Sequence, residues 1–200
     1  MNNDNKCIIT IGREYGSGGR IIGKKLSEKL NIPFYDRELI RMIAVESGIA
    51  EELIKQVEQL RESSLIYDAY DVNCQVPFAE RIHTAQKKII TNIADKGSCV
   101  IVGRCADYLL KDNKNCLKVF IYAPFEDRVK RVTEEYCPKV KNIKNHIKRL
   151  DKDRAAYYDY FTTDKWGDKN HYHIVLNSSI GIDLCVNIIE AAYKSWNINA

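Results

Sequence analysis

The sequence feature that most constrains the fold is a glycine-rich turn between an apolar run and a helical pattern. The apolar run is Cys7–Ile11, the turn reads Gly12-Arg-Glu-Tyr-Gly-Ser-Gly-Gly-Arg20, and apolar residues then recur at Ile22, Leu26 and Leu30. Glycine tolerates positive φ angles and lets a ligand approach the backbone closely. Successive N–H groups and the start of a helix attract anions. A strand, this turn and a helix therefore predict a phosphate site built from main-chain groups.

The turn departs from the standard phosphate-binding loop, which reads G-x-x-x-x-G-K-[ST]. If Gly18 is the last glycine of that pattern, the lysine position falls on Gly19. The hydroxyl position then falls on Arg20 and the first glycine on Arg13, and either arginine could supply the missing positive charge. One step along a helix rotates a side chain by about 100°. Arg20 is therefore also consistent with a solvent-facing charge, and the stretch with a turn that holds no ligand.

Five short apolar runs are predicted to be strands buried on both faces, because they are continuous or nearly so. Helical patterns lie between them, which predicts an α/β protein with a parallel sheet and right-handed crossovers. The 200 residues suit one domain. The predicted strands are Cys7–Ile11, Pro33–Asp36, Ser98–Gly103, Cys116–Tyr122 and Tyr172–Leu176, and helical spacing also marks Ile82–Ala94 and Val186–Tyr193.

Two connections are longer than an ordinary crossover, namely residues 37–80 and residues 125–170. Long insertions in a compact α/β domain usually form lids or binding segments. Both segments are rich in charge and tyrosine, and the tyrosines could either stack on a base or pack within a lid. The arginines and tyrosines are Arg37, Arg41, Arg61, Tyr67 and Tyr70 in the first segment, and Arg128, Arg131, Arg149, Arg154, Tyr157, Tyr158 and Tyr160 in the second.

The composition limits the possible partners. A net charge of +4 suits an anionic ligand, but without a concentrated basic stripe it argues against nucleic acid. The apolar runs are far shorter than the about 18 residues that a membrane span needs. Met1–Lys6 lacks the apolar core of a signal peptide. We therefore expect a cytoplasmic protein without membrane contact, whose seven cysteines are reduced and either structural or incidental.

Three motifs in order resemble the cytidylate kinase-like family of P-loop proteins, a divergent relative of bacterial cytidylate kinase. They read Ile8-Ile-Thr-Ile-Gly-Arg-Glu-Tyr-Gly-Ser-Gly-Gly-Arg20, Leu30-Asn-Ile-Pro-Phe-Tyr-Asp-Arg-Glu-Leu39 and Val102-Gly-Arg-Cys-Ala-Asp107. The resemblance runs from Ile8 to about Tyr193. It implies a nucleoside monophosphate kinase-like fold in three layers, with a five-stranded parallel sheet. It also implies one domain over residues 1–200, an acceptor-binding insert at about 37–80 and a lid at about 125–170.

The resemblance also implies site residues. The phosphate loop, expected to bind the nucleotide cofactor, comprises Arg13, Gly16, Ser17, Gly18, Gly19 and Arg20. The expected catalytic arginines are Arg20, Arg128, Arg131 and Arg154. The expected substrate-binding residues are Asp36, Arg37, Arg41, Arg104 and Asp151, of which Arg41 is one step out of register with the family arginine.

The implied cofactors are ATP and Mg²⁺. Phosphoryl transfer needs in-line positioning and positive charge around the moving group, and arginine forks bind phosphate oxygens in pairs. Mg²⁺ needs only one or two protein oxygens. Ser17 is the loop hydroxyl nearest the expected metal position and Asp36 a carboxylate behind it, although no residue is predicted as a direct metal ligand.

The first functional hypothesis is ATP-dependent phosphoryl transfer to a nucleoside monophosphate, with cytidylate as the family's named substrate, or to a related small phosphate acceptor. The alternative is a nucleotide-binding regulator whose degenerate loop supports little or no turnover. A third hypothesis, a nucleic-acid-binding module, rests on the basic stretch Lys139–Arg149, which is also typical of a helix with one solvated face. The expected partners are small-molecule nucleotides, and no sequence feature indicates an oligomeric state.

Two further signals are interpreted as structural. His171 and His173 would share one face of a strand, but no cysteine or carboxylate at ligand spacing accompanies them, so we interpret them as ordinary strand residues. Trp166 lies in a turn-like stretch and is interpreted as an anchor of that loop.

Overall fold

The protein is built on five parallel strands in the order β2-β3-β1-β4-β5. The computed structural model describes residues 6–58 and 77–196. The predicted α/β class and five-stranded parallel sheet are confirmed, and each predicted strand is present with small shifts at its ends. The strands are β1 Ile8–Arg13, β2 Phe34–Tyr35, β3 Cys99–Val102, β4 Cys116–Tyr122 and β5 Ile174–Asn177.

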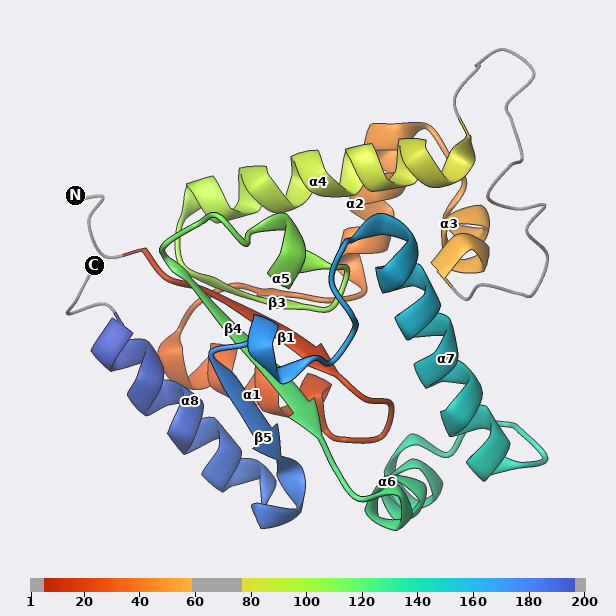
Figure 1. Ribbon diagram of the computed structural model, residues 1–200, viewed down its shortest axis with the longest axis vertical. Helices are drawn as coiled ribbons and strands as arrows, with labels where there is room; N and C mark the ends of the chain where they lie inside the picture. Colours follow the sequence, from red (N-terminus) through yellow and green to blue (C-terminus); the bar gives the residue numbers. More distant parts are fainter. Residues whose placement is uncertain (1–5, 59–76, 197–200) are drawn as a thin grey trace.

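Helices cover both faces of the sheet, which gives three layers (Figure 1). Alternate side chains of β1 point to opposite faces, so Ile9 and Ile11 pack with the core under α1 and α8, whereas Ile8 packs with the core under α2, α4 and α5. The helices named here are α1 Gly19–Leu30, α2 Glu38–Ser47, α4 Phe78–Lys96, α5 Ala106–Leu109 and α8 Ile182–Trp196.

The two long connections are largely helical in the described residues. The first contains α2 and α3 Glu51–Glu58 before α4, and its Arg61, Tyr67 and Tyr70 lie outside the described residues. The second contains α6 Phe125–Arg131, the π-helix η3 Val132–Tyr136, α7 Ile143–Phe161 and the 3₁₀ helix η4 Lys169–His171, and η5 Ser178–Ile180 follows β5. The roles of these segments as acceptor insert and lid stay predictions.

Two of the three tyrosines of α7 pack inward, which fits the packing interpretation for them, whereas Tyr160 is half-exposed. Tyr157 and Tyr158 are buried, and the Tyr157 hydroxyl lies 3.1 Å from Gln86 Oε1 in α4. The Tyr158 hydroxyl donates to Asp107 Oδ2 at 2.8 Å. These hydrogen bonds attach α7 to α4 and α5 and so fix its position relative to both helices.

The loop after α7 is anchored by aromatic packing. The ring of Trp166 meets that of Phe120 in β4 edge-on, with centroids 5.5 Å apart, as expected for an anchor. Neither histidine lies in a strand, so that part of the interpretation was wrong: His171 ends η4 beside Asp164, and His173 precedes β5, where its Nδ1 accepts the Lys118 N–H at 3.0 Å. Within residues 6–58 and 77–196, no helix is long and apolar enough to cross a bilayer.

The packing of α2 predicts a large difference between two positions on that helix. Ile43 is fully buried, whereas Val45 is 81% exposed. Ile43→Ala removes buried methyl groups and leaves a cavity, so we expect the free energy of unfolding to fall by about 2–5 kcal/mol. Val45→Ala is the matched control and should change it by less than about 0.5 kcal/mol. Urea unfolding followed by circular dichroism measures both, and equal effects would contradict the described position of α2.

Candidate active site

The glycine-rich turn forms a tight, buried loop at the carboxyl end of β1. Gly16 and Gly18 have φ angles of 82° and 81°, in the left-handed region that favours glycine. Gly18 caps α1, and no side chain among the described residues caps the helix in its place. A Cβ on Gly18 would lie 2.6 Å from Ile182 Cδ1. The first-turn N–H groups of α1 are therefore left for a ligand, and that end of the helix attracts anions.

Two arginines of α6 hold the loop by its carbonyl oxygens. Arg131 Nη1 donates to the Gly16 oxygen at 2.8 Å, and Arg128 Nη1 donates to the Tyr15 oxygen at 3.1 Å. Because the C=O and N–H of one trans peptide point in opposite directions, the N–H of Gly16 is turned away from Arg128. Neither arginine lines the cleft described below, as far as the described residues show. They hold the loop through its carbonyl oxygens, and the expectation that they reach the moving phosphate stays a prediction.

Acidic side chains balance the charge of Arg128. The carboxylate of Asp151 in α7 pairs with Arg128 and accepts the Tyr15 N–H at 2.6 Å. Glu14 Oε2 lies 3.4 Å from Arg128 Nε and accepts the Ala123 N–H at 3.2 Å. Burial raises the pKa of Glu14. Asp151 thus contacts the loop backbone itself, and the expectation that it binds substrate stays a prediction.

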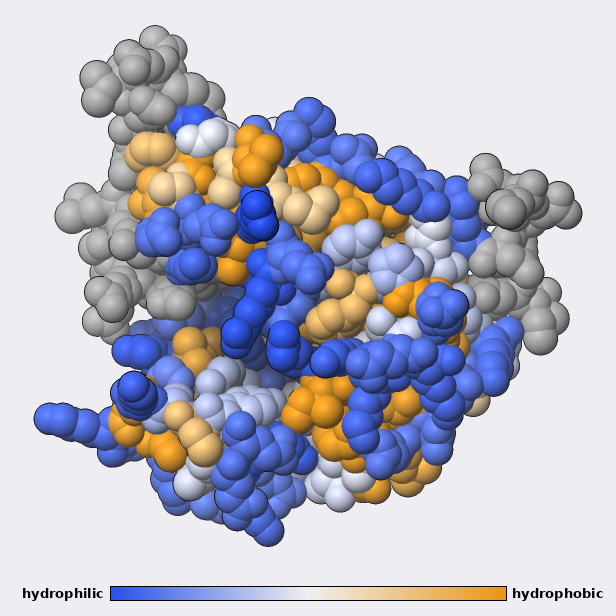
Figure 2. All heavy atoms as spheres, turned by 180° about the vertical axis from the view of Figure 1, so that it is seen from behind, coloured by the Kyte–Doolittle hydropathy of each residue, from blue (hydrophilic) through white to orange (hydrophobic). Residues whose placement is uncertain are grey.

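A cleft of about 890 Å³ opens over the carboxyl ends of β1, β2 and β3. This volume lies within the usual range for small-molecule sites. Figure 2 shows, from behind, a hollow bordered by strongly hydrophilic side chains. The cleft brings together five of the predicted arginines from separate segments, namely Arg13, Arg20, Arg37, Arg104 and Arg154.

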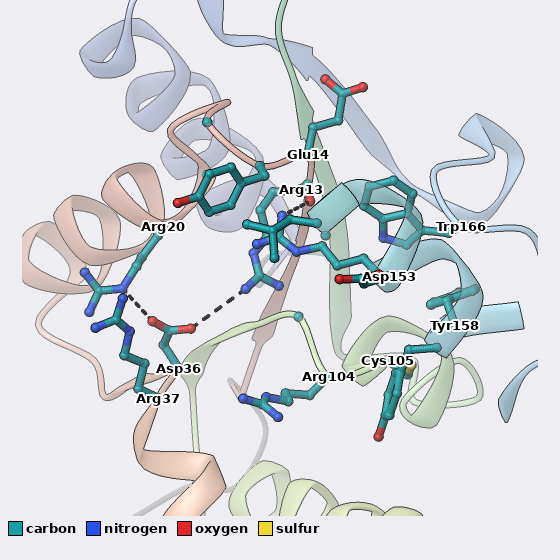
Figure 3. A pocket seen from close by; sticks show the side chains of 18 of the residues that line it. Arg13, Glu14, Arg20, Asp36, Arg37, Arg104, Cys105, Asp153, Tyr158 and Trp166 are labelled. Carbon is teal, nitrogen blue, oxygen red and sulfur yellow. Dashed lines mark hydrogen bonds and ion pairs between the residues drawn. The ribbon is translucent and has the colours of Figure 1, made fainter. Parts of the chain in front are cut away.

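The carboxylate of Asp36 joins two of these arginines. Arg20 Nε lies 2.5 Å from Asp36 Oδ2, and Arg13 Nη2 lies 3.9 Å from Asp36 Oδ1 (Figure 3). Asp36 is buried, and such a charge is stable only when it is paired. Arg20 is half-exposed, yet its ion pair directs it toward the cleft, so it is more than a solvent-facing helix charge.

The cations of the cleft are crowded. Arg154 Nη1 donates to the Arg13 carbonyl oxygen at 3.0 Å, and its guanidinium lies 5.5 Å from the centre of the Tyr15 ring. Burial, followed by the charge of Arg13, lowers the pKa of Arg154 to about 9. Burial is also the main reason why the pKa of Arg104 is lowered to about 10. Both side chains stay charged at neutral pH, so an anion that enters the cleft would relieve their repulsion.

Two predicted site residues lie elsewhere. Arg41 is exposed on α2 and lines a separate cavity with Ile89 and Lys96 of α4, which corrects its assignment to the substrate. Ser17 is fully buried, and its hydroxyl donates to the carbonyl oxygens of Glu14 and Ile121 at 2.9 and 3.0 Å. This hydroxyl faces the sheet, so it does not fit the expected place beside a metal ion.

The cleft also contains residues that the sequence did not single out. They are Tyr15 and Glu14 in the loop, Lys55 and Glu51 in α3, Tyr136 in η3, and Asp107 and Asp153. Asp107 follows β3 by a few residues, and side chains at the carboxyl ends of parallel strands gather at the ligand crevice. That rule could have identified Asp107, whose pKa is raised by burial. Among the described residues, no group of three His, Cys, Asp or Glu side chains is placed to hold a metal ion.

The fold is of the P-loop kinase type. The fold matches solved small-molecule kinases at low identity. These include a gluconokinase from Sinorhizobium meliloti, with a TM-score of 0.59 and 12% identity over 98% of this chain and 97% of that one. Another is the shikimate kinase from Acinetobacter baumannii in complex with shikimate, with a TM-score of 0.53 and 17% identity over 95% and 94%. These likenesses concern the fold alone.

The chain belongs to the cytidylate kinase-like family, whose model matches residues 8–180. Cytidylate kinases from Methanococcus aeolicus and Methanocaldococcus jannaschii are each 28% identical to it over 191 residues, which cover 92% of this chain and 96% of each relative. An uncharacterized protein from Eubacterium ventriosum, known from its crystal structure, is 31% identical, with a TM-score of 0.71 over 95% of this chain and 99% of that one. The resemblance noted in the sequence is therefore confirmed at the level of the family.

The crowded cations predict stabilisation by a simple polyphosphate. Inorganic tripolyphosphate at about 100 times its dissociation constant should add about 2.7 kcal/mol to the free energy of unfolding. For a chain of this size, that raises the midpoint of thermal unfolding by several degrees. Sodium chloride at equal ionic strength is the control. Equal shifts in the two salts would show that the cleft does not select phosphate.

The loop contacts predict a specific effect of Arg131. Arg131→Ala removes the bond to the Gly16 oxygen, and a bond to a charged donor contributes about 1.5–3 kcal/mol. We expect ATP affinity to fall at least about tenfold and amide hydrogen exchange to accelerate in the loop. Lys130→Ala, next to it on α6 and exposed, is the control and should leave both unchanged. Calorimetry and hydrogen exchange measure the two effects, and an unchanged loop in Arg131→Ala would contradict this role.

Proposed function

We propose that this protein transfers the γ-phosphoryl group of ATP to a nucleoside monophosphate, with cytidylate as the first candidate and a related small phosphate acceptor as the second. One observation carries the proposal: loop amides and five arginines from separate segments meet in a single cleft at the carboxyl ends of the strands. Family membership supports the same reaction class. The name of the archaeal relatives supports cytidylate as the acceptor.

The geometry supports distinct places for donor and acceptor. The loop and the start of α1 would hold the donor phosphates, because their N–H groups carry no capping side chain among the described residues. Arg104 after β3 and Arg37 after β2 would hold the acceptor phosphate on the far side of Arg13. An acceptor phosphate oxygen would attack the γ-phosphorus while the bond to the β,γ-bridging oxygen breaks. The products are ADP and a nucleoside diphosphate.

The arginines would stabilise the charge on the moving group. In the transition state the negative charge is spread over the equatorial oxygens of the γ-phosphoryl group, and catalysis is mostly positioning and electrostatic stabilisation. Arg154 and Arg20 approach the cleft from α7 and α1, so they would contact the phosphates from two sides. Arg128, Arg131 and Asp151 would act indirectly, through the orientation of the loop.

Mg²⁺ would enter with the nucleotide, where it neutralises phosphate charge. It keeps several waters and needs few protein oxygens, which fits a cleft whose loop hydroxyl, Ser17, faces the sheet. Asp36 is the carboxylate at the loop that could accept hydrogen bonds from water on the ion. It is already held in place by Arg13 and Arg20.

A nucleotide-binding regulator is the second candidate. The observation that favours it is the glycine at the lysine position of the loop, Gly19, which removes the side chain that usually reaches the β- and γ-phosphates. Such a protein would bind ATP in the same cleft without measurable product. The two candidates differ in turnover and not in binding.

An assay with purified protein, ATP, Mg²⁺ and a panel of nucleoside monophosphates tests the proposal. We expect diphosphate formation, fastest with cytidylate, and an acceptor kcat/KM about 10–100-fold lower in Arg104→Ala, because an ionic hydrogen bond is lost. Arg104→Lys, which keeps the charge, should recover part of the loss. Arg149→Ala removes an exposed arginine of α7 and is the control.

Tight ATP binding without product across the panel would favour the regulator. Turnover that is unchanged in a folded Arg104→Ala variant would contradict the assigned acceptor site.

A further inference from the structure

We infer that the loop contains a compensating exchange, in which Arg13 provides the phosphate-binding cation that a lysine at position 19 provides in the standard loop. The inference rests on the proposed function, because it specifies how the same cleft holds the donor phosphates. It assigns to Arg13 a contact with the β- and γ-phosphates, and to Gly19 the role of leaving room for that side chain.

The first argument is the space around Gly19. A Cβ on Gly19 would lie 2.7 Å from Arg13 Cβ and 3.1 Å from Arg13 Cγ. Cβ atoms essentially never approach this closely, so a lysine at position 19 and the present side chain at position 13 exclude each other. In the aligned pattern these are two of the three departures: Arg13 stands at the first glycine and Gly19 at the lysine, and the third departure is Arg20 at the hydroxyl position. The two departures are thus in direct contact.

The second argument is the path of the Arg13 side chain. It leaves the end of β1, passes Gly19, and carries its guanidinium over Gly103 at the end of β3. Gly103 has a φ of 76°, and a Cβ there would overlap Arg13 Nη1. The guanidinium therefore lies in a channel between two glycines. Figure 3 shows it in the middle of the cleft, between the loop and Asp36.

The third argument is that the surroundings hold this cation in place. Asp36 Oδ1 lies 3.9 Å from Arg13 Nη2, and Arg154 donates to the Arg13 carbonyl oxygen. The side chain is about one-fifth exposed, so it is mostly desolvated but can still reach a ligand. A planar guanidinium can bind oxygens of two phosphates at once, which suits a polyphosphate better than a monophosphate.

Arg20 is a weaker candidate for the same role. Its side chain is half-exposed, and its Nε already lies 2.5 Å from Asp36. It starts from α1 one residue beyond the lysine position, which turns it by about 100°. Arg20 thus holds the Asp36 carboxylate on one side, and Arg13 lies on the other.

The exchange can be reversed by mutation. Three variants form the test: Arg13→Gly, Gly19→Lys, and the double variant R13G/G19K, which restores the first glycine and the lysine of the standard pattern. Glycine at position 13 is required, because even alanine would keep the Cβ that collides with position 19. Lys24→Ala removes an exposed charge of α1 and is the control. Calorimetry gives the affinities for ATP, ADP and AMP, and circular dichroism checks that each variant is folded.

Arg13→Gly should weaken ATP binding about 10–100-fold, the effect of losing ionic hydrogen bonds, with a smaller loss for ADP and none for AMP. Gly19→Lys should also bind ATP poorly, because its side chain meets Arg13. The double variant should bind ATP at least about tenfold better than Arg13→Gly, and Lys24→Ala should match the natural protein.

Three outcomes would overturn the inference. One is ATP binding in folded Arg13→Gly equal to that of the natural protein. Another is a folded double variant that binds no better than Arg13→Gly. The third is an equal loss for AMP and ATP, which would give Arg13 no preference for the β- and γ-phosphates. A natural protein that binds no nucleotide would instead defeat the proposed function, which separates the two failures.

Discussion

The hydrogen bonds from α6 to the carbonyl oxygens of Tyr15 and Gly16 are the interactions on which the site depends. A glycine-rich loop loses much conformational entropy when it is ordered, so it adopts one shape only if other groups hold it. Arg128 and Arg131 do so from behind, and Glu14 and Asp151 balance the buried charge of Arg128. The N–H groups at the start of α1 have no capping side chain among the described residues, so they are available to an anion, which is a form of electrostatic preorganisation.

The cleft in front of the loop contains charges of both signs, because Glu14, Asp36, Glu51, Asp107 and Asp153 line it together with Lys55 and the arginines. Five arginines line it, and Asp36 is shared between two of them. The pKa values of Arg104 and Arg154 are lowered mainly by burial. Burial thus destabilises the charged form of both side chains, and a bound anion would stabilise it. Carboxylates therefore act in both places: Glu14 and Asp151 pair with Arg128, and Asp36 pairs with two of the cleft arginines that would contact a polyphosphate.

Much of this could be read from the sequence, for identifiable reasons. The strands are buried on both faces, and their continuous apolar runs marked them. Arg13, Arg20, Arg37 and Arg104 end or follow a strand or the loop, so the sheet brings them together, whereas Arg154 comes from within α7. The sequence identified Arg128, Arg131 and Asp151 as site residues but not the groups that they contact. Those contacts depend on how α6 and α7 pack. The structure does not place Arg41 in the cleft, because one step on a helix changes the face on which a side chain lies.

The contacts of α7 link the second long connection to the loop. Asp151 accepts the N–H of Tyr15, and Arg154 donates to the carbonyl oxygen of Arg13. The helix is therefore hydrogen-bonded to the backbone on both sides of Glu14. The same helix is fixed to α4 and α5 by Tyr157 and Tyr158. A displacement of α7 must therefore either move the loop or break these bonds. The conformation that binds phosphate and the position of α7 over the cleft are thus coupled through hydrogen bonds to the main chain.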